Sequence, residues 1–257
     1  MRIGLCASLT SAFDPPADLA YLEPQVGQTL CPRESDEEFA RRCLTVRSLS
    51  LPVEALAVLF PGDMPLTGPA ADERVIDQYI ATVCHRAGVL GITRIVFGSG
   101  AARKVPEGFD KHAAEGQLVG HMKRWGPMLA AAKTTLVLEP LNKGETNIVN
   151  SVTEGAALVR AVNHPWVRLL ADTYHMSTES ESPQAIVDAG DLIWHVHTAQ
   201  REGRLALGVG TEDQRPYFAA LKRIGYDGRV SIEANWKDMP ADLAKAVAEL
   251  RRQWEMA

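Results

Sequence analysis

Four side chains of the types that bind hard metal ions stand at or near the ends of apolar runs. Glu139 follows TTLVL, Asp172 follows VRLLA, His197 lies in LIWHVHT, and Glu233 follows RVSI. Three carboxylates and one imidazole favour Mn²⁺ or Mg²⁺, with Co²⁺ or Zn²⁺ as alternatives, over a thiolate-bound zinc. These residues therefore predict the chemistry of one divalent metal ion, provided that the fold brings them together.

The apolar runs themselves predict the strands of a parallel sheet. Eight such runs alternate with helical segments, at residues 2–8, 20–25, 53–60, 92–99, 134–141, 167–174, 192–198 and 229–235. Capping boxes from Ser35 to Glu38 and from Ser151 to Glu154 mark two helix starts. Eight strand–helix units in about 250 residues are typical of an α/β (β/α)₈ TIM barrel, so we expect one domain over residues 1–257. An open doubly wound sheet is the rival, but no glycine-rich phosphate loop follows the first run.

Catalytic residues of such barrels lie at the C-terminal ends of the strands, where the four candidate ligands would converge. Taken alone, Glu139 could satisfy loop donors, Asp172 could cap the next helix, and a buried histidine is often structural. Glu233 is harder to explain otherwise, because an unpaired carboxylate among buried strand residues costs free energy. Of His195 and His197, we expect one to point into the barrel and the other toward the helices. The four positions together favour a shared metal site.

Polar residues on the loops that follow are candidates for contacts with a hydroxylated substrate. Glu145 and His175 come shortly after Glu139 and Asp172, and Arg204 lies in the loop REGRLALGVG. Such side chains supply donors and acceptors for hydroxyl groups, although solvated loop charge is the alternative. Four other residues could line the expected pocket, although each is more typical of packing or of the surface: Cys6, Glu23, Phe60 and Trp125.

The composition is that of an ordinary globular protein and narrows the function classes. Of the 257 residues 46% are hydrophobic, and 32 acidic against 27 basic side chains give a net charge of -5. This balance argues against a nucleic-acid or anionic-membrane surface. The four cysteines have no CxxC spacing and no signal peptide precedes them, so we expect reduced thiols and a cytoplasmic protein. No apolar run has the length of a membrane span.

Five strings occur in a characteristic order: LEPLNKGETNIVN, LLADTYHM, WHVHTAQ, the glycine pair in ALGVG, and GYDGRVSIEAN. In this order they resemble the sugar isomerase and epimerase branch of the xylose isomerase-like TIM barrels, which includes D-tagatose and D-psicose 3-epimerases, hydroxypyruvate isomerase and inosose-type isomerases. The resemblance implies metal ligands at Glu139, Asp172, His197 and Glu233, and substrate contacts at Glu145, His175 and Arg204. The loop of Arg204 departs from the family, which commonly has a proline at the position of Leu207.

The resemblance also implies a reaction. A keto-sugar or related hydroxy-carbonyl substrate would bind the metal, and Glu139 and Glu233 would serve as acid and base on the two faces of an enediolate. Which glutamate takes the proton depends on the handedness of the substrate. Proton abstraction beside a ketone also starts β-elimination, so a lyase or dehydratase acting on a keto-sugar or keto-glycoside is the alternative. Further alternatives are a non-catalytic sugar-binding barrel and, less favoured, an endonuclease IV-like nuclease. A homo-dimer or homo-tetramer is a family-level expectation.

Overall fold

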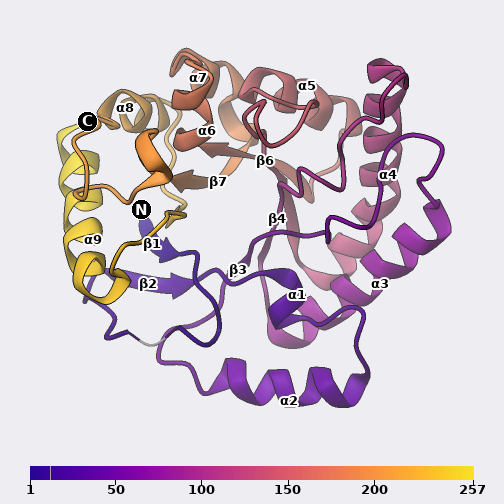
Figure 1. Cartoon of the computed structure of the whole chain (residues 1–257), viewed down its shortest axis with the longest axis horizontal. Coiled ribbons are helices and arrows are strands. Elements are labelled where there is room, and N and C mark those ends of the chain that lie inside the picture. Colours follow the sequence, from indigo (N-terminus) through magenta and orange to yellow (C-terminus); the bar gives the residue numbers. More distant parts are fainter. Residues whose placement is uncertain (12) are drawn as a thin grey trace.

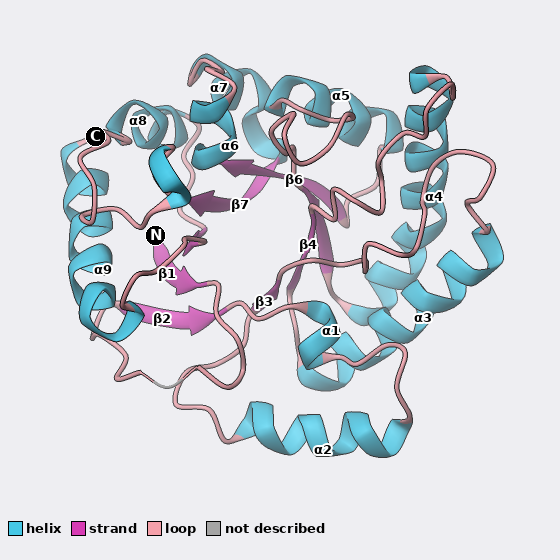
Figure 2. Cartoon of the chain, viewed as in Figure 1, coloured by secondary structure: helices cyan, strands magenta, loops and turns pink. Residues whose placement is uncertain are grey.

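Eight parallel strands surround the centre of the protein, and helices lie around them on the outside (Figures 1 and 2). The structure, a computed structural model, describes residues 1–11 and 13–257. The strands are β1 (Arg2–Leu5), β2 (Leu19–Leu22), β3 (Ala55–Leu56), β4 (Arg94–Phe97), β5 (Thr135–Leu138), β6 (Val167–Asp172), β7 (Ile193–Thr198) and β8 (Arg229–Ile232). Each overlaps one of the eight predicted runs, most of which also contain the start of the following loop.

The strands form a ring. Hydrogen bonds join them in the order β2-β1-β8-β7-β6-β5-β4-β3, which is a barrel cut between β2 and β3. Isolated parallel bridges from Leu22 to Val53 and from Gln25 to Ala57 connect these two edges. The ring is therefore nearly closed, and the predicted TIM barrel is confirmed.

Helices follow every strand except the first. They are α1 (Val26–Thr29), α2 (Asp36–Arg47), α3 (Glu73–Leu90), α4 (Lys111–Ala132), α5 (Val152–Val162), α6 (Thr173–Thr178), α7 (Gln184–Ala189), α8 (Arg215–Arg223) and α9 (Met239–Met256), with 3₁₀ turns η1 (Gly190–Leu192) and η2 (Glu202–Arg204). Between β1 and β2, residues 6–11 and 13–18 contain no helix, so one of the eight predicted strand–helix units is incomplete. Pro15 and Pro16 disfavour a helix in the second half of this connection, because a proline lacks an N–H donor and disfavours helical geometry in the residue before it.

Two helices begin at the predicted capping residues. The Ser35 hydroxyl accepts a hydrogen bond from the backbone N–H of Glu38 at 3.3 Å, and the Ser151 hydroxyl accepts one from Glu154 at 3.0 Å. These bonds satisfy donors that have no partner within the first turn. No helix in the described part of the chain is both long and apolar enough to cross a membrane.

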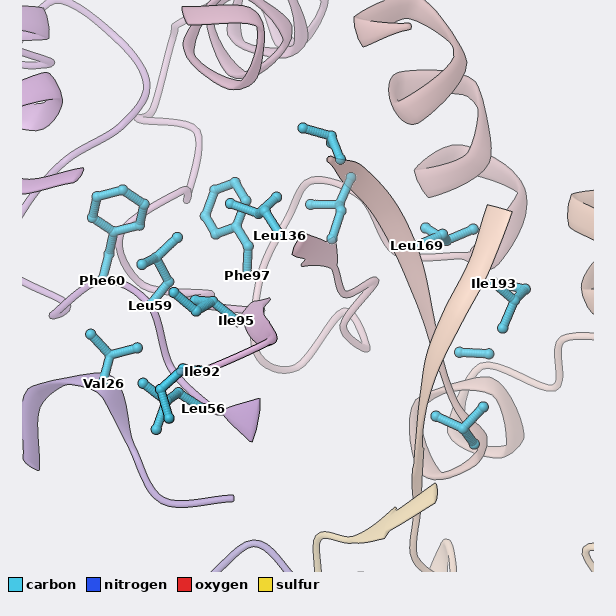
Figure 3. Close-up of a cluster of buried hydrophobic side chains, with 14 of the residues drawn as sticks. Val26, Leu56, Leu59, Phe60, Ile92, Ile95, Phe97, Leu136, Leu169 and Ile193 are labelled. Atoms are coloured by element: carbon cyan, nitrogen blue, oxygen red, sulfur yellow. The ribbon is translucent and has the colours of Figure 1, made fainter. Parts of the chain in front are cut away.

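The apolar side chains fill two separate regions. The larger region lies between the strands and the helices and includes Phe97, Leu136 and Leu169 (Figure 3). A second cluster, Val96, Val137 and Leu170, is separate from it. Because side chains alternate between the two faces of a strand, these three residues point into the barrel. Glu139 and Asp172 each follow one of them by two positions and therefore face the same interior.

Candidate metal centre

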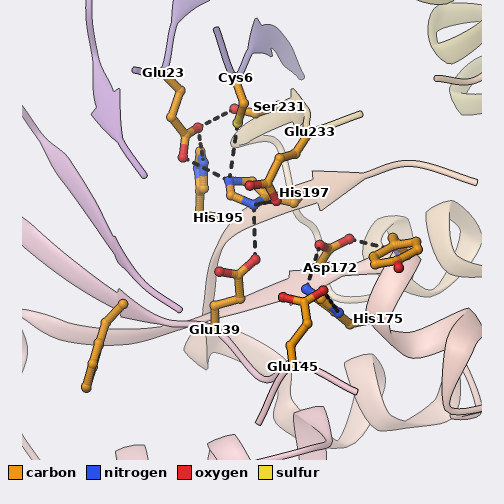
Figure 4. A network of polar contacts seen from close by, with 12 residues as sticks. Cys6, Glu23, Glu139, Glu145, Asp172, His175, His195, His197, Ser231 and Glu233 are labelled. Atoms are coloured by element: carbon orange, nitrogen blue, oxygen red, sulfur yellow. Dashed lines mark hydrogen bonds and ion pairs between the residues drawn. The ribbon is translucent and has the colours of Figure 1, made fainter. Parts of the chain in front are cut away.

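The four predicted metal ligands converge at the C-terminal mouth of the barrel. Glu139 comes directly after β5, Asp172 ends β6, His197 lies near the end of β7, and Glu233 comes directly after β8. One ligand atom from each of the four lies within 4.8 Å of the others, and their side chains point toward one another (Figure 4). Glu139, Asp172 and His197 are buried and Glu233 is partly buried.

The distances within this cluster suit a shared cation. His197 Nδ1 lies 3.1 Å from Glu139 Oε1 and 3.1 Å from Glu233 Oε2. Asp172 Oδ1 accepts a hydrogen bond from the Tyr174 N–H at 2.8 Å and so caps α6. Its other oxygen, Oδ2, is buried without a hydrogen-bond partner in the described residues. Its nearest basic neighbours are His175 Nε2 at 3.5 Å and Arg204 Nη2 at 3.6 Å. Because a buried carboxylate oxygen without a hydrogen bond is costly, this atom fits a ligand of a hard divalent ion.

The pKa values of the three carboxyl groups in the cluster are shifted in different directions. Burial raises the pKa of Glu139, against its hydrogen bond to His197. Burial also raises the pKa of Asp172, to about 6, against the positive charge of Arg204. For Glu233 burial acts in the same direction, but the charge and hydrogen bond of His197 and the charge of Arg204 outweigh it and lower the pKa to about 2. A bound cation would favour the ionised form of all three carboxyls.

We expect the affinity for Mn²⁺ to fall as the pH decreases, and most steeply below about 6, the pKa of Asp172. Although burial lowers the pKa of His197, the charge of Glu23 raises it above its usual value, so the proton on Nδ1 must also be displaced. Asp172 and Glu139 both have raised pKa values, so their protonated forms prevail at low pH and must release protons before they bind a metal. For each displaced proton the dissociation constant should rise by about tenfold per pH unit. Calorimetric Mn²⁺ titrations between about pH 5 and 7.5 measure this change, and a pH-independent affinity would contradict the assignment of these ligands.

The three predicted substrate contacts lie beside the cluster, and Arg204 links them to it. Its Nη2 atom lies 2.5 Å from Glu233 Oε2 and 3.6 Å from Asp172 Oδ2, and its Nη1 atom lies 3.4 Å from Glu145 Oε1. His175 Nδ1 accepts a hydrogen bond from the Asn142 N–H at 3.1 Å. The other ring nitrogen of His175, Nε2, is buried and has no hydrogen-bond partner among the residues described.

A cavity of about 280 Å³ opens beside Arg204 and Glu233, and Cys6, Glu23, Ala57 and Val58 also line it. Its size is near the lower limit of ligand pockets, about 300 Å³.

The family assignment comes from comparison with known proteins. A family model described as the xylose isomerase-like TIM barrel matches residues 17–254. The chain belongs to this family. The predicted resemblance is therefore confirmed at the level of the family.

Two relatives of this xylose isomerase-like barrel with similar sequences are named as sugar epimerases. The L-ribulose 3-epimerase of Methylomonas sp. (strain DH-1) is 38% identical over 117 residues, which cover 45% of this chain and 41% of that protein. The ketose 3-epimerase of Arthrobacter globiformis is 35% identical over 119 residues, or 46% of this chain and 41% of that protein. The chain thus matches about two fifths of the length of these curated relatives.

The same fold extends over the whole chain in solved structures. The crystal structure of D-allulose 3-epimerase from Methylomonas sp. in complex with D-allulose superimposes with a TM-score of 0.80 at 24% identity, covering 98% of this chain and 97% of that chain. At this identity the likeness concerns the fold alone.

One prediction about the interior of this xylose isomerase-like barrel is wrong. His195 and His197 both point inward, with ring centroids 5.2 Å apart. Residues two positions apart on a strand share a face, so the pair had to lie on the same side. Both histidines are fully buried.

Glu23 is the residue that sequence reasoning missed. It was expected to pack or to lie on the surface, yet it is 1% exposed and its Oε1 atom lies 2.8 Å from His197 Nε2. The available signal was a carboxylate directly after the apolar run LAYL of β2. Phe60 and Trp125, in contrast, are core residues as expected, with ring centroids 5.4 Å apart.

Two further residues place the Glu139 carboxylate. A Cβ atom on Gly98 would lie 2.3 Å from Glu139 Oε2, so glycine at the end of β4 leaves room for the carboxylate. Arg103 is completely buried and donates hydrogen bonds to the carbonyl oxygens of Phe97 at 3.0 Å and Glu139 at 2.7 Å. Its guanidinium group therefore ties together the ends of β4 and β5.

Proposed function

We propose that the protein is a divalent-metal-dependent epimerase or isomerase of a keto-sugar or a related hydroxy-carbonyl compound. The observation that carries the proposal is the convergence of three carboxylates and one imidazole at the barrel mouth, with a buried Asp172 oxygen that lacks a hydrogen-bond partner in the described residues. The relatives named as 3-epimerases of ketoses support epimerisation over other reactions of the same site.

Glu139, Asp172, His197 and Glu233 would hold the metal ion, with Mn²⁺ or Mg²⁺ favoured by the predominance of carboxylate oxygens. A divalent ion held there would supply Lewis-acid polarisation of the substrate carbonyl, which would make the neighbouring C–H more acidic. The site must also be dry enough for this effect to be strong, and the burial of three of the four ligands supports that.

Glu139 and Glu233 are the proposed acid and base. They come from β5 and β8, which are separated by β6 and β7 in the ring, so they reach the cluster from different sides. One would take the proton from the substrate carbon, and the other would return a proton to the opposite face. Their pKa values are shifted in opposite directions, as is common for acid and base pairs that share a site.

The remaining polar side chains would orient the substrate. Because Nδ1 of His175 already accepts from Asn142, its Nε2, which makes no hydrogen bond to the described residues and lies 3.5 Å from Asp172 Oδ2, would donate to a substrate oxygen. Arg204 and Glu145 would bind further hydroxyl groups, as a guanidinium donor and a carboxylate acceptor. Fixed positions for several hydroxyls hold the reacting carbon next to the glutamates.

Incubation of the Mn²⁺-loaded protein with candidate ketoses in D₂O tests the proposal. We expect deuterium to enter at the carbon beside the carbonyl and the epimer or isomer to accumulate, because the returned proton comes from a group that exchanges with solvent. Metal-free protein serves as the control and should be inactive. Loss of a leaving group would instead support a lyase or dehydratase, and absence of exchange with every keto-sugar would contradict both reactions.

A further inference from the structure

We propose that Glu23 is a positioning residue that fixes the tautomer and the orientation of His197, so that Nδ1 is the nitrogen available to the metal. The proposal rests on the metal site of the proposed function, and it concerns a residue outside the ligand set. Glu23 follows β2 and reaches the histidine on β7 across β1 and β8, which lie between them in the ring.

Glu23 uses both carboxylate oxygens inside the barrel (Figure 4). Its Oε1 atom lies 2.8 Å from His197 Nε2, and its Oε2 atom lies 2.8 Å from His195 Nε2. The Ser231 hydroxyl also donates to Oε2, at 2.5 Å. The carboxylate therefore holds two imidazole rings, one of which belongs to the metal centre.

The chemistry of these bonds decides the tautomer. An ionised carboxylate only accepts hydrogen bonds, so each Nε2 atom that contacts Glu23 must carry a hydrogen. When a metal displaces the second proton of the imidazolium, His197 keeps its hydrogen on Nε2 and offers the lone pair of Nδ1. Nδ1 is also the atom that lies 3.1 Å from both Glu139 and Glu233. Nε2 of the His197 ring thus contacts Glu23, and Nδ1 of the same ring faces the metal cluster.

A second set of contacts holds Glu23 itself. Ser231 donates its hydrogen to Glu23, so its oxygen is free to accept from the Tyr21 hydroxyl at 2.7 Å. Gly4 makes this chain of hydrogen bonds possible, because a Cβ atom there would lie 2.1 Å from the Tyr21 ring. Glu23, Tyr21 and Ser231 are at most 1% exposed. Although Glu23 borders the cavity at the barrel mouth, almost none of its surface is therefore exposed to water that could replace it as the partner of His197.

A carboxylate behind a metal-binding histidine is expected to strengthen metal binding. It keeps the ring in the orientation that the metal requires and raises the basicity of the ligating nitrogen, and its loss typically weakens metal affinity by about 10–100-fold. Because His197 is the one nitrogen ligand of the proposed set, the effect of Glu23 should appear directly in the affinity of the site.

The Glu23→Gln variant tests this role. The two histidines contact different oxygens of Glu23. Glutamine replaces one of these oxygens with an NH₂ group, which only donates, so its two terminal atoms cannot both accept from histidines. We expect the dissociation constant for Mn²⁺, measured by calorimetry, to rise by about 10–100-fold. Glu181→Gln is the matched control, because Glu181 is a partly buried carboxylate that accepts hydrogen bonds from Val152 and Thr153 at the start of α5. The control should bind Mn²⁺ as the wild type does.

A second measurement needs no variant and so does not depend on how Glu23→Gln folds. Long-range ¹H–¹⁵N spectra of the wild-type protein loaded with diamagnetic Mg²⁺ or Zn²⁺ report which nitrogen of His197 carries hydrogen. We expect hydrogen on Nε2 and the metal on Nδ1. Hydrogen on Nδ1, or wild-type Mn²⁺ affinity in a folded Glu23→Gln variant, would overturn the proposal.

The outcomes separate this proposal from the proposed function. A protein that binds metal with His197 in the expected tautomer but epimerises no sugar would overturn the function and support the role of Glu23. A wild-type protein that binds no divalent metal would overturn both.

Discussion

Replacement of Glu139 by glutamine is expected to lower turnover by about 10²–10⁴-fold at saturating Mn²⁺. The amide has nearly the shape of the carboxylate but can neither take nor return a proton. We expect the fold to persist, because burial already disfavours the charge of Glu139 and raises its pKa, and because the space beside Gly98 still accommodates a side chain of this length. Turnover is measured on the ketose identified by deuterium exchange, and the fold by circular dichroism and thermal unfolding.

Two controls keep this result interpretable. The Mn²⁺ affinity of Glu139→Gln must be measured separately, since an amide oxygen is a weaker ligand than a carboxylate, and turnover is then compared at saturation. Glu181→Gln, which removes a carboxylate outside the metal centre, should keep wild-type turnover. Near-normal activity of Glu139→Gln would show that Glu139 does not transfer the proton.

The strands and the ligand cluster could be predicted because both follow from local patterns in the sequence: apolar runs that form strands, and side chains that alternate between the two faces of a strand. Val137 points into the barrel and Leu170 does so on the next strand, so the alternation of side chains carries Glu139 and Asp172 to the same interior. The topology then adds His197 and Glu233, because consecutive strands of a closed barrel are neighbours and their C-terminal ends meet at one mouth. The same alternation, applied correctly, would have placed His195 beside His197.

The contacts of Glu23 and Arg103 could not be predicted in this way. Glu23 meets His197 because the ring of strands brings the end of β2 close to β7. Gly4 on β1 also leaves space for the Tyr21 ring, which a Cβ atom at that position would contact. Arg103 crosses from the loop after β4 to the carbonyl of Glu139 on the next strand. Such pairings depend on distances across the barrel, whereas sequence patterns report on one strand or helix at a time.

Removal of the divalent metal is expected to abolish turnover and to lower the midpoint of thermal unfolding. Without the ion, three carboxyl groups remain close together around His197, and Asp172 Oδ2 lacks a hydrogen-bond partner in the described chain. A ligand present at 100 times its dissociation constant stabilises the folded state by about 2.7 kcal/mol. For a chain of this size that corresponds to roughly 5–10 °C. The comparison is between protein dialysed against EDTA and the same protein after Mn²⁺ is restored.

The Asp172→Asn variant shows whether this stabilisation comes from the proposed centre. Asparagine retains an oxygen that can accept from the Tyr174 N–H and cap α6, but it removes a buried charge. We expect the metal-free variant to be at least as stable as metal-free wild type, and Mn²⁺ to stabilise it much less. If Mn²⁺ raised the unfolding midpoint equally in both proteins, the ion would bind elsewhere and Asp172 would not be its ligand. If Asp172→Asn kept its stability without metal but was no longer stabilised by Mn²⁺, the buried carboxylate of Asp172 would contribute to metal binding and not to the stability of the fold.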